Sequence, residues 1–238
     1  MTTLIKILIT AFLSFFCFSC NFMGGVRGKG EVISKERTVN EDYTALKVSR
    51  GLDVILIRDS EPKVIVEANE NLHDYIEIYV KNNTLYVTAK ENIYSADKKD
   101  IFVSYEVLNK ISASSGAHIS SEHIVTEKNL ALHVSSGADI DIEVKANEVS
   151  TAASSGAMLR VSGETKSHIA KASSGANVRA EKLSSLISEA KASSGANIKI
   201  YAENEFTGNA SSGGNVAYYG NPQKVEESDS SGGNVQKR

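Results

Sequence analysis

The tetrapeptide Ser193-Ser194-Gly195-Ala196, together with six close copies of it, decides the fold of this chain. Each copy reads Ser-Ser-Gly followed by Ala or Gly, and successive copies begin 18 to 21 residues apart. A repeat of this length is the signature of a solenoid, in which each copy belongs to one coil and neighbouring coils stack. The copies begin at Ser114, Ser135, Ser154, Ser173, Ser193, Ser211 and Ser230.

Small and apolar residues alternate on both sides of each copy. Leu132 and Val134 precede the second copy, and Ile140 and Ile142 follow it. A period of two indicates β-strands with one face buried. Glycine enters the positive-φ region without steric cost, so we predict that each motif glycine forms a bend between two strands. These structural turn residues are Gly116, Gly137, Gly156, Gly175, Gly195, Gly213 and Gly232.

Two kinds of β-helix compete for this pattern. The left-handed kind is built from hexapeptides and needs a marker every six residues, whereas this chain has one marker per coil and a variable period. A right-handed coil also follows the preference of parallel crossovers. The predicted fold class is all-β, a single-stranded right-handed parallel β-helix. We expect the second serine of each copy to point into the slim core and to hydrogen-bond along the stack.

Residues 43–105 carry longer alternating segments instead of the motif. The segment Lys81-Asn82-Asn83-Thr84 is typical of a hairpin turn, because Asn tolerates positive φ. We predict that these strands form an antiparallel cap that covers the first coil. The expected strands are 45–48, 53–58, 63–68, 76–81, 84–89 and 101–105.

The first residues have the character of an export signal. Lys6 precedes an apolar run, Ile7 to Phe18, which is too short to span a bilayer and is followed by Ser19 and Cys20. The stretch ending in Cys20 resembles a bacterial lipobox, so we predict cleavage before Cys20 and acylation of that residue. An uncleaved anchor is the alternative. Because Cys17 is the only other cysteine, the mature protein would have no disulfide.

These features divide the chain into a lipoprotein signal peptide (1–19), a flexible Gly-rich tether (20–39) and one β-helix domain (40–238). Within the domain we expect the cap at 40–107 and the coils at 108–238. The chain would be exported to the bacterial cell envelope and held there by lipid, on the outer membrane, with the periplasmic or surface face left open. After cleavage the chain would contain 25 basic and 29 acidic residues. Because its net charge would be negative, nucleic acid is not an expected partner.

One family shares this combination of features. The tract Gly51-Leu52-Asp53-Val54-Ile55-Leu56, the segment Asn83-Thr84-Leu85-Tyr86-Val87 and the recurring Ser-Ser-Gly-Ala resemble the head GIN domain family of auto-transporter adhesins. The resemblance covers the chain from about Tyr43 to its end. It implies a secreted or lipid-anchored β-helical protein of the Bacteroidetes type, and the family name suggests adhesion. It carries no catalytic residue over to this chain.

Three carboxylates, on Asp139, Asp141 and Glu143, alternate with apolar residues and so project from one outward face. Such a row can bind Ca²⁺ or serve lyase or glycosidase chemistry. One coil later the same column holds Arg160, which should lie opposite Asp141. This register favours a solvated surface ion pair.

Other polar groups also repeat. Seven equivalent turn serines do not fit a nucleophile, which must be unique and lie beside a base. The residues Asn177, Asn197, Asn215 and Asn234 share a column and predict an amide ladder, with a polar ligand-binding row as the alternative. The histidines show no metal-ligand spacing, and we expect no catalytic residue, metal or cofactor. The five histidines are His73, His118, His123, His133 and His168.

We therefore expect a non-enzymatic, lipid-anchored envelope protein of an adhesin-like or scaffolding type. The alternative is a polysaccharide-binding or polysaccharide-degrading β-helix, although the coils carry few aromatic residues and no Trp. The expected partners are the membrane, through the lipid, and a glycan or protein ligand, with a homo-oligomer left open. Acidic residues in the last coil, Glu226, Glu227 and Asp229, should discourage end-to-end stacking of its strand edge.

Overall fold

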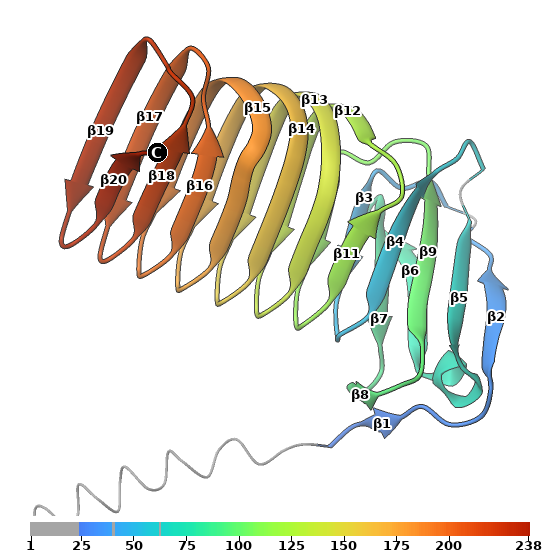
Figure 1. Cartoon of the computed structure of the whole chain (residues 1–238). Coiled ribbons are helices and arrows are strands. Elements are labelled where there is room, and N and C mark those ends of the chain that lie inside the picture. The colour runs from blue at the N-terminus through green and yellow to red at the C-terminus, as the bar shows by residue number, and fades with distance from the viewer. Residues whose placement is uncertain (1–23, 40, 62) are drawn as a thin grey trace, which may run out of the picture.

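The computed structural model describes residues 24–39, 41–61 and 63–238. Parallel coils stack along one axis, and antiparallel strands close the N-terminal end of the stack (Figure 1). The predicted fold class, a right-handed parallel β-helix with an antiparallel cap, is confirmed. Cys20 and the predicted signal peptide lie outside the described residues.

Regular structure consists almost entirely of strands. The cap contains β1 (Val26–Arg27), β2 (Val32–Arg37), β5 (Val64–Asn69), the 3₁₀ helix η2 (Glu70–Asp74), β6 (Ile76–Lys81), β7 (Thr84–Ala89), β8 (Ile93–Ser95) and β9 (Lys99–Tyr105). The coils contain β3 (Ala45–Val48), β4 (Asp53–Arg58), β10 (Lys110–Ala113), β11 (His118–Ser121), β12 (Val125–Val134), β13 (Asp139–Ala153), β14 (Met158–Ala172), β15 (Asn177–Ala192), β16 (Asn197–Tyr201), β17 (Glu205–Ser211), β18 (Asn215–Tyr219), β19 (Lys224–Ser230) and β20 (Asn234–Lys237).

Each Ser-Ser-Gly motif is a tight β-turn that reverses the chain at one edge of the coil. In the fifth copy the amide of Ala196 donates to the carbonyl of Ser193 at 3.1 Å. Both central residues have positive φ, 51° at Ser194 and 70° at Gly195, as in a type I′ turn. All seven motif glycines have φ between 68° and 74°, which confirms the predicted turn residues.

The prediction for the second serines was wrong. These residues have φ between 49° and 54° and are exposed, because the two central residues of the turn protrude from the coil. The small residue directly after the motif glycine faces inward instead; Ala196, for example, is fully buried. The turns are linked by the backbone, since the amide of Gly195 donates to the carbonyl of Ser212 at 3.1 Å. The serines concerned are Ser115, Ser136, Ser155, Ser174, Ser194, Ser212 and Ser231.

The turns divide the outside of the solenoid into two faces. We call the outer surface of the strands that lead into the turns the pre-turn face; it comprises β7, β3, β10, β12, the ends of β13, β14 and β15, then β17 and β19. The outer surface of the strands that follow the turns is the post-turn face; it includes β11, the starts of β13, β14 and β15, then β16, β18 and β20.

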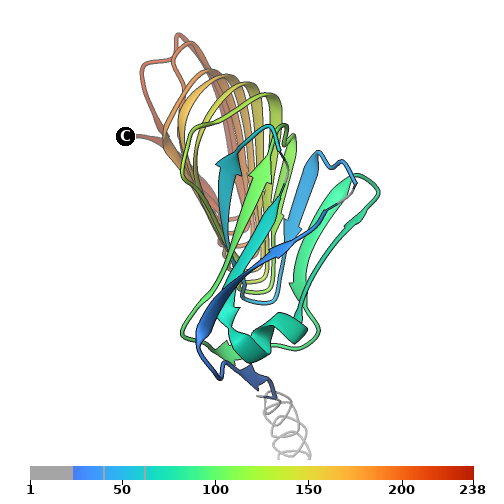
Figure 2. The same cartoon turned by 90° about the vertical axis from the view of Figure 1, so that its right-hand side faces the viewer.

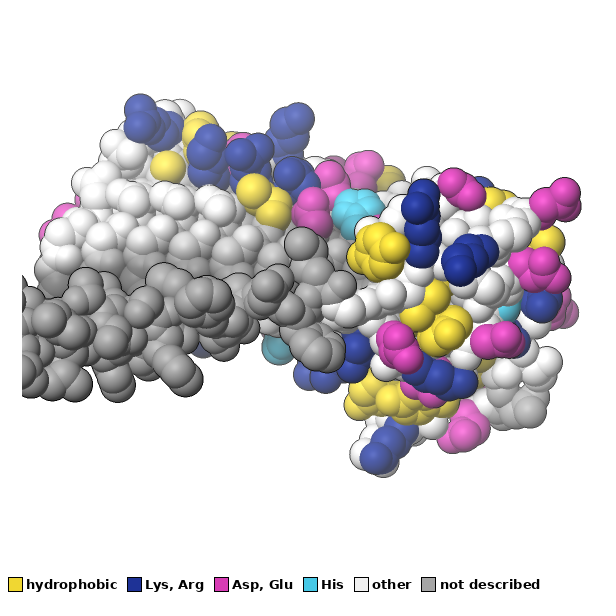
Figure 3. All heavy atoms as spheres, turned by 90° about the horizontal axis from the view of Figure 1, so that it is seen from below, with side chains coloured by type: hydrophobic (Ala, Val, Ile, Leu, Met, Phe, Trp, Pro, Cys, Tyr) yellow, Lys and Arg dark blue, Asp and Glu magenta, His cyan; other side chains and the backbone are white. Residues whose placement is uncertain are grey.

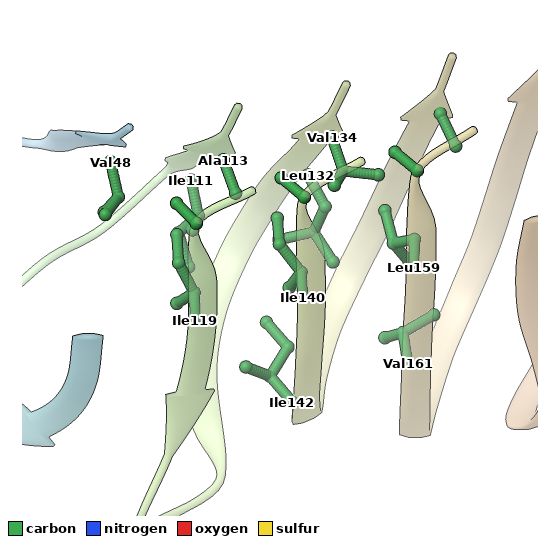
Figure 4. Packing of buried hydrophobic residues seen from close by; sticks show 14 of the residues in the cluster. Val48, Ile111, Ala113, Ile119, Leu132, Val134, Ile140, Ile142, Leu159 and Val161 are labelled. Atoms are coloured by element: carbon green, nitrogen blue, oxygen red, sulfur yellow. The ribbon is translucent and has the colours of Figure 1, made fainter. Parts of the chain in front are cut away.

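The core is a set of columns of aliphatic side chains between these two sheets. Ile119, Ile140 and Leu159 are in register on successive coils and are fully buried. Figure 4 shows them beside Ile111 and Leu132 from the opposite sheet. Because every coil repeats the same alternation, one narrow apolar layer continues through the stack.

The coils begin earlier than expected. Strands β3 and β4, placed in the cap by the sequence, pair in parallel with β10 and β11. The turn between them is Ser49-Arg50-Gly51-Leu52, with φ of 61° at Arg50 and 67° at Gly51, and the amide of Gly51 donates to the carbonyl of Ser115 at 3.0 Å. This segment is an eighth, degenerate copy of the motif. Strands β7 and β9 add a further parallel layer, onto which β5 and β6 pack antiparallel (Figure 2).

Two strands lie within residues 20–39, where we expected a flexible tether. Strand β2 pairs antiparallel with β5, and β1 pairs with β8. A Cβ atom on Gly28 would lie 2.4 Å from Oδ1 of Asn69. Glycine is therefore required in this part of the segment by close packing against the cap.

We predict that the motif glycines contribute through backbone conformation alone. No atom lies within 4 Å of the position that a Cβ on Gly195 would occupy, so Gly195→Ala should cost about 1 kcal/mol from positive φ and not from a clash. Ser194→Asn should raise stability, because Asn adopts positive φ more readily. Urea unfolding followed by circular dichroism measures both changes. A Gly195→Ala variant with unchanged stability would contradict this account.

Candidate functional site

A groove of about 970 Å³ runs along the pre-turn face. It begins at β7 in the cap, crosses β3, β10, β12, β13 and β14, and ends at β15. One in-register column crosses this groove, and its members are Tyr86, Lys47, Ser112, His133, Ala152, Lys171 and Lys191.

Strand alternation places these side chains outside. Ala170 and Ala172, on either side of Lys171, are buried, so Lys171 points away from the core. The middle of the column is occupied by Ala152, whose methyl group leaves the groove open between its two ends. The first serines of the motifs line one side; they are Ser114, Ser135, Ser154, Ser173 and Ser193.

The groove is basic although the whole chain has a net charge of −3. Lys47, Lys110, Lys171 and Lys191 line it, together with His133, and no Asp or Glu is among its lining residues. None of these four lysines takes part in an ion pair within the described parts of the chain. Five layers separate Lys47 from Lys191, which at about 4.8 Å per layer gives roughly 24 Å.

Aromatic residues lie at the cap end of the groove. The rings of Tyr86 and Tyr79 stack with centroids 5.1 Å apart and planes 6° apart. The ammonium group of Lys47 lies 5.9 Å from the centroid of Tyr86, and Tyr79 is 45% exposed. The sequence did not reveal this arrangement, because the alignment of β7 with the coils cannot be read from the repeat.

The three carboxylates predicted on one face lie on the post-turn side. Asp141 is in register with Arg160 as predicted, but the guanidinium group bonds to the neighbouring Asp139, at 2.8 and 3.1 Å. The Arg160 nitrogen is 3.9 Å from Asp141, and Glu143 is opposite Ser162. Within residues 24–39, 41–61 and 63–238 no group of three His, Cys, Asp or Glu side chains is placed to hold a metal.

Basic residues also align on the post-turn face, where Arg160, Arg179 and Lys199 occupy successive coils. Figure 3 shows Lys and Arg side chains along one side of the coils, beside a band of turns without charged groups. This column differs from the groove in that Arg160 is paired with a carboxylate.

The predicted asparagine ladder is confirmed. The amide nitrogen of Asn197 donates to Oδ1 of Asn177, and that of Asn215 donates to Oδ1 of Asn197, each at 3.2 Å. Asn234 continues the column in register. The bonds run along the stack, so the amides link coils to each other.

The histidines are dispersed. His118 lies in β11 on the post-turn face, and His123 lies in the loop between β11 and β12. His73 is buried in the cap. In the groove, burial and the charge of Lys110 lower the pKa of His133. His168 is fully buried, and its Nε2 lies 3.0 Å from the hydroxyl of Thr151. Burial lowers the pKa of His168 from 6.5 to about 3.

One of the sequence-based predictions concerns membrane attachment. The predicted lipidation site, Cys20, lies outside the described residues. Among the residues that the structure describes, no helix has the length and apolar character needed to cross a bilayer.

Comparison with protein families finds one model that matches residues 42–222; its description is "Putative auto-transporter adhesin, head GIN domain". A search of curated proteins finds no match.

Several solved structures of Bacteroidetes proteins have the same fold. A "putative adhesin" from Bacteroides fragilis has a TM-score of 0.81 and 17% identity, over 90% of this chain and 100% of that one. A "putative adhesin" and a "putative lipid binding protein", both from Parabacteroides distasonis, have TM-scores of 0.73 and 0.74 and identities of 21% and 16%. Each alignment covers 90% of this chain and 99% of the other. At these identities the likeness shows the fold.

We predict that His168 makes the fold sensitive to acid. Its folded-state pKa is depressed, so below pH 6.5 the unfolded chain binds a proton that the folded chain excludes. This contribution to stability is complete above pH 6.5 and is lost between pH 6.5 and 3, with a loss of about 2 kcal/mol at pH 5.

Unfolding in urea at pH 7.5 and pH 5 tests this dependence. His168→Leu, which repeats the residue found in this column at Leu130, should remove most of it. The exposed His123→Gln is the control and should retain it. Equal pH dependence in the wild type and His168→Leu would assign the effect to other groups.

Proposed function

Because the chain belongs to the head GIN domain family of auto-transporter adhesins, we propose that it is a non-enzymatic binding protein of the bacterial cell envelope. In this proposal a lipid on Cys20 holds the protein on the membrane, and the groove on the pre-turn face receives the ligand. The observation that carries the proposal is the groove itself, a continuous concave surface across seven strands.

The groove has the form of a binding surface for an extended ligand. It is long, and its floor is built from strands that are fixed on both sides by parallel hydrogen-bonded neighbours. Rigid floors lose little conformational freedom on binding, which favours affinity. Adhesion through repeated contacts along such a surface also suits a protein that is concentrated on a membrane.

The chemistry of the lining favours binding over catalysis. Glycoside hydrolysis by the common route requires two carboxyl groups on either side of the scissile bond, and the groove residues include none. His133 has no carboxylate beside it to orient its ring as a general base, since the lining near it is Ser, Ala and Lys. These groups can hold a ligand by charge and hydrogen bonds.

One structure of similar fold is described as lipid binding. Acyl chains are bound by large apolar side chains that line a pocket. In this groove the apolar lining residues Leu46 and Val134 are buried beneath the floor, and the outward residues are Lys, Ser, Ala, His, Thr and Tyr. The lining therefore favours a polar ligand over an acyl chain.

We predict that filling the groove abolishes binding to envelope material. Ala152→Tyr places a large side chain on the outward floor without touching the core. Ala217→Tyr is the matched control, because Ala217 occupies an outward, half-buried position on the post-turn face. Labelled protein would be incubated with envelope fractions of a Bacteroides strain, and the bound fraction measured. Loss in Ala152→Tyr alone supports the groove; equal binding by both variants and the wild type excludes it.

We predict that the anchor is a lipid on Cys20. Cells given an alkyne fatty acid should incorporate label into the wild-type protein, because an acylated N-terminal cysteine carries the chains that hold it on the membrane. Cys20→Ser should lose the label, whereas Cys17→Ser should keep it. Equal labelling of the wild type and Cys20→Ser would contradict the proposed anchor.

A further inference from the structure

We propose that the groove binds a linear anionic polysaccharide, one whose sugar residues carry carboxylate or sulfate groups. This inference rests on the proposed function, and it adds the chemical class of the ligand. The four groove lysines would pair with the acid groups, the serine row would hydrogen-bond to sugar hydroxyls, and the Tyr79–Tyr86 pair would pack against a ring at the cap end.

The distribution of charge indicates a polymer and not a single anion. Lys47 and Lys110 lie at the cap end, Lys171 and Lys191 lie toward the far end, and Ala152 is between them. Lys47 and Lys191 are roughly 24 Å apart along the stack at about 4.8 Å per layer. One small anion cannot contact both pairs, whereas a chain with an acid group on successive units can.

The four groove lysines are available to a ligand because they are held in no ion pair. Charge-assisted bonds to carboxylate or sulfate are about twice as strong as neutral hydrogen bonds, and none of the four lysines is paired with a protein carboxylate in the described parts of the chain. On the post-turn face, by contrast, Asp139 neutralises Arg160. Arg179 and Lys199 on that face also take part in no ion pair within the described parts of the chain. The groove differs in that its four unpaired lysines line a hollow together with a row of serines.

The polar lining favours a sugar chain over other polyanions. Serine hydroxyls both donate and accept hydrogen bonds, which matches sugar hydroxyls, and they recur at each of five successive turns along the groove. Single-stranded nucleic acid is bound by aromatic side chains that stack on successive bases, but here the aromatic pair occurs only at one end.

The test uses the mature protein as it is extracted from the membrane fraction in neutral detergent. The probes are polygalacturonate and dextran sulfate, each compared with its uncharged counterpart, fully methyl-esterified polygalacturonate and dextran. Single-stranded DNA and vesicles with one third anionic phospholipid represent the competing classes. Affinity is measured by fluorescence anisotropy for the soluble probes and by co-sedimentation for vesicles.

We expect at least one of the two charged polymers to bind about ten-fold or more tightly than its uncharged counterpart. The double variant Lys171→Gln/Lys191→Gln should weaken that binding about ten-fold. The control Arg179→Gln/Lys199→Gln makes the same charge change on the post-turn face and should alter affinity less than two-fold. Raising the salt concentration should weaken the interaction, because its groups are exposed.

Several results would overturn the inference. They are failure of both charged polymers to bind, equal binding of the uncharged counterparts, an equal loss in the two double variants, and tighter lysine-dependent binding of DNA or vesicles. Failure of the ligand class is distinguishable from failure of the proposed function. If neither polymer binds but Ala152→Tyr still abolishes binding to envelope fractions, the groove remains the binding surface for another ligand. If Ala152→Tyr also leaves envelope binding unchanged, both proposals are excluded.

Discussion

The rest of this structure depends on one backbone constraint, the pair of consecutive positive-φ residues at each turn. Ser194 and Gly195 reverse the chain within two residues and give every coil the same corner. The amide of Gly195 then bonds to the carbonyl of the next turn, at Ser212, so the corners are aligned along the axis. Once the corners align, residues at equivalent positions in successive coils must lie opposite each other, about 4.8 Å apart.

This alignment converts repetition in the sequence into columns on the molecule. Inside, the columns are aliphatic and form a continuous core. Outside, a column of asparagines forms hydrogen bonds from coil to coil, and Arg160 bonds diagonally to Asp139. A column of like charges would repel itself, and the groove avoids this in its middle by placing His133 and Ala152 between the lysines at its two ends.

The two ends of the stack differ in how their last strands are covered. At the N-terminal end, β7 and β9 extend the parallel ladders by one layer, and antiparallel pairing with β5 and β6 then stops them. The 3₁₀ helix η2 and strand β2 complete this cap. At the C-terminal end, β19 is exposed along its whole length and carries Glu226, Glu227 and Asp229. The cap also brings the Tyr79–Tyr86 pair to the groove, so the element that closes the core helps to shape the candidate site.

The sequence by itself determined most features that depend on local conformational preference and on the repeat period. The turns at the motif glycines, the strand bounds near Ala45–Val48 and Thr84–Ala89, the Asn82-Asn83 hairpin and the register of Asp141 with Arg160 were all predicted. These features follow from local conformational preference and from a period that aligns one coil with the next. For the same reason Lys171 and Lys191 could be aligned in advance.

Only the tertiary structure decided what joins segments far apart in the chain. Leu46 pairs with Ile111, 65 residues later in the chain. The motif repeats every 18 to 21 residues, so this period could not reveal that the turn at Arg50-Gly51 belongs to a coil. The strands within residues 24–37 depend in the same way on partners in β5 and β8. The outward position of Ser194 followed from turn geometry and not from residue size. The groove combines both kinds of information, because its lysines at Lys171 and Lys191 repeat locally, whereas Lys47 and Tyr86 join them only through long-range pairing.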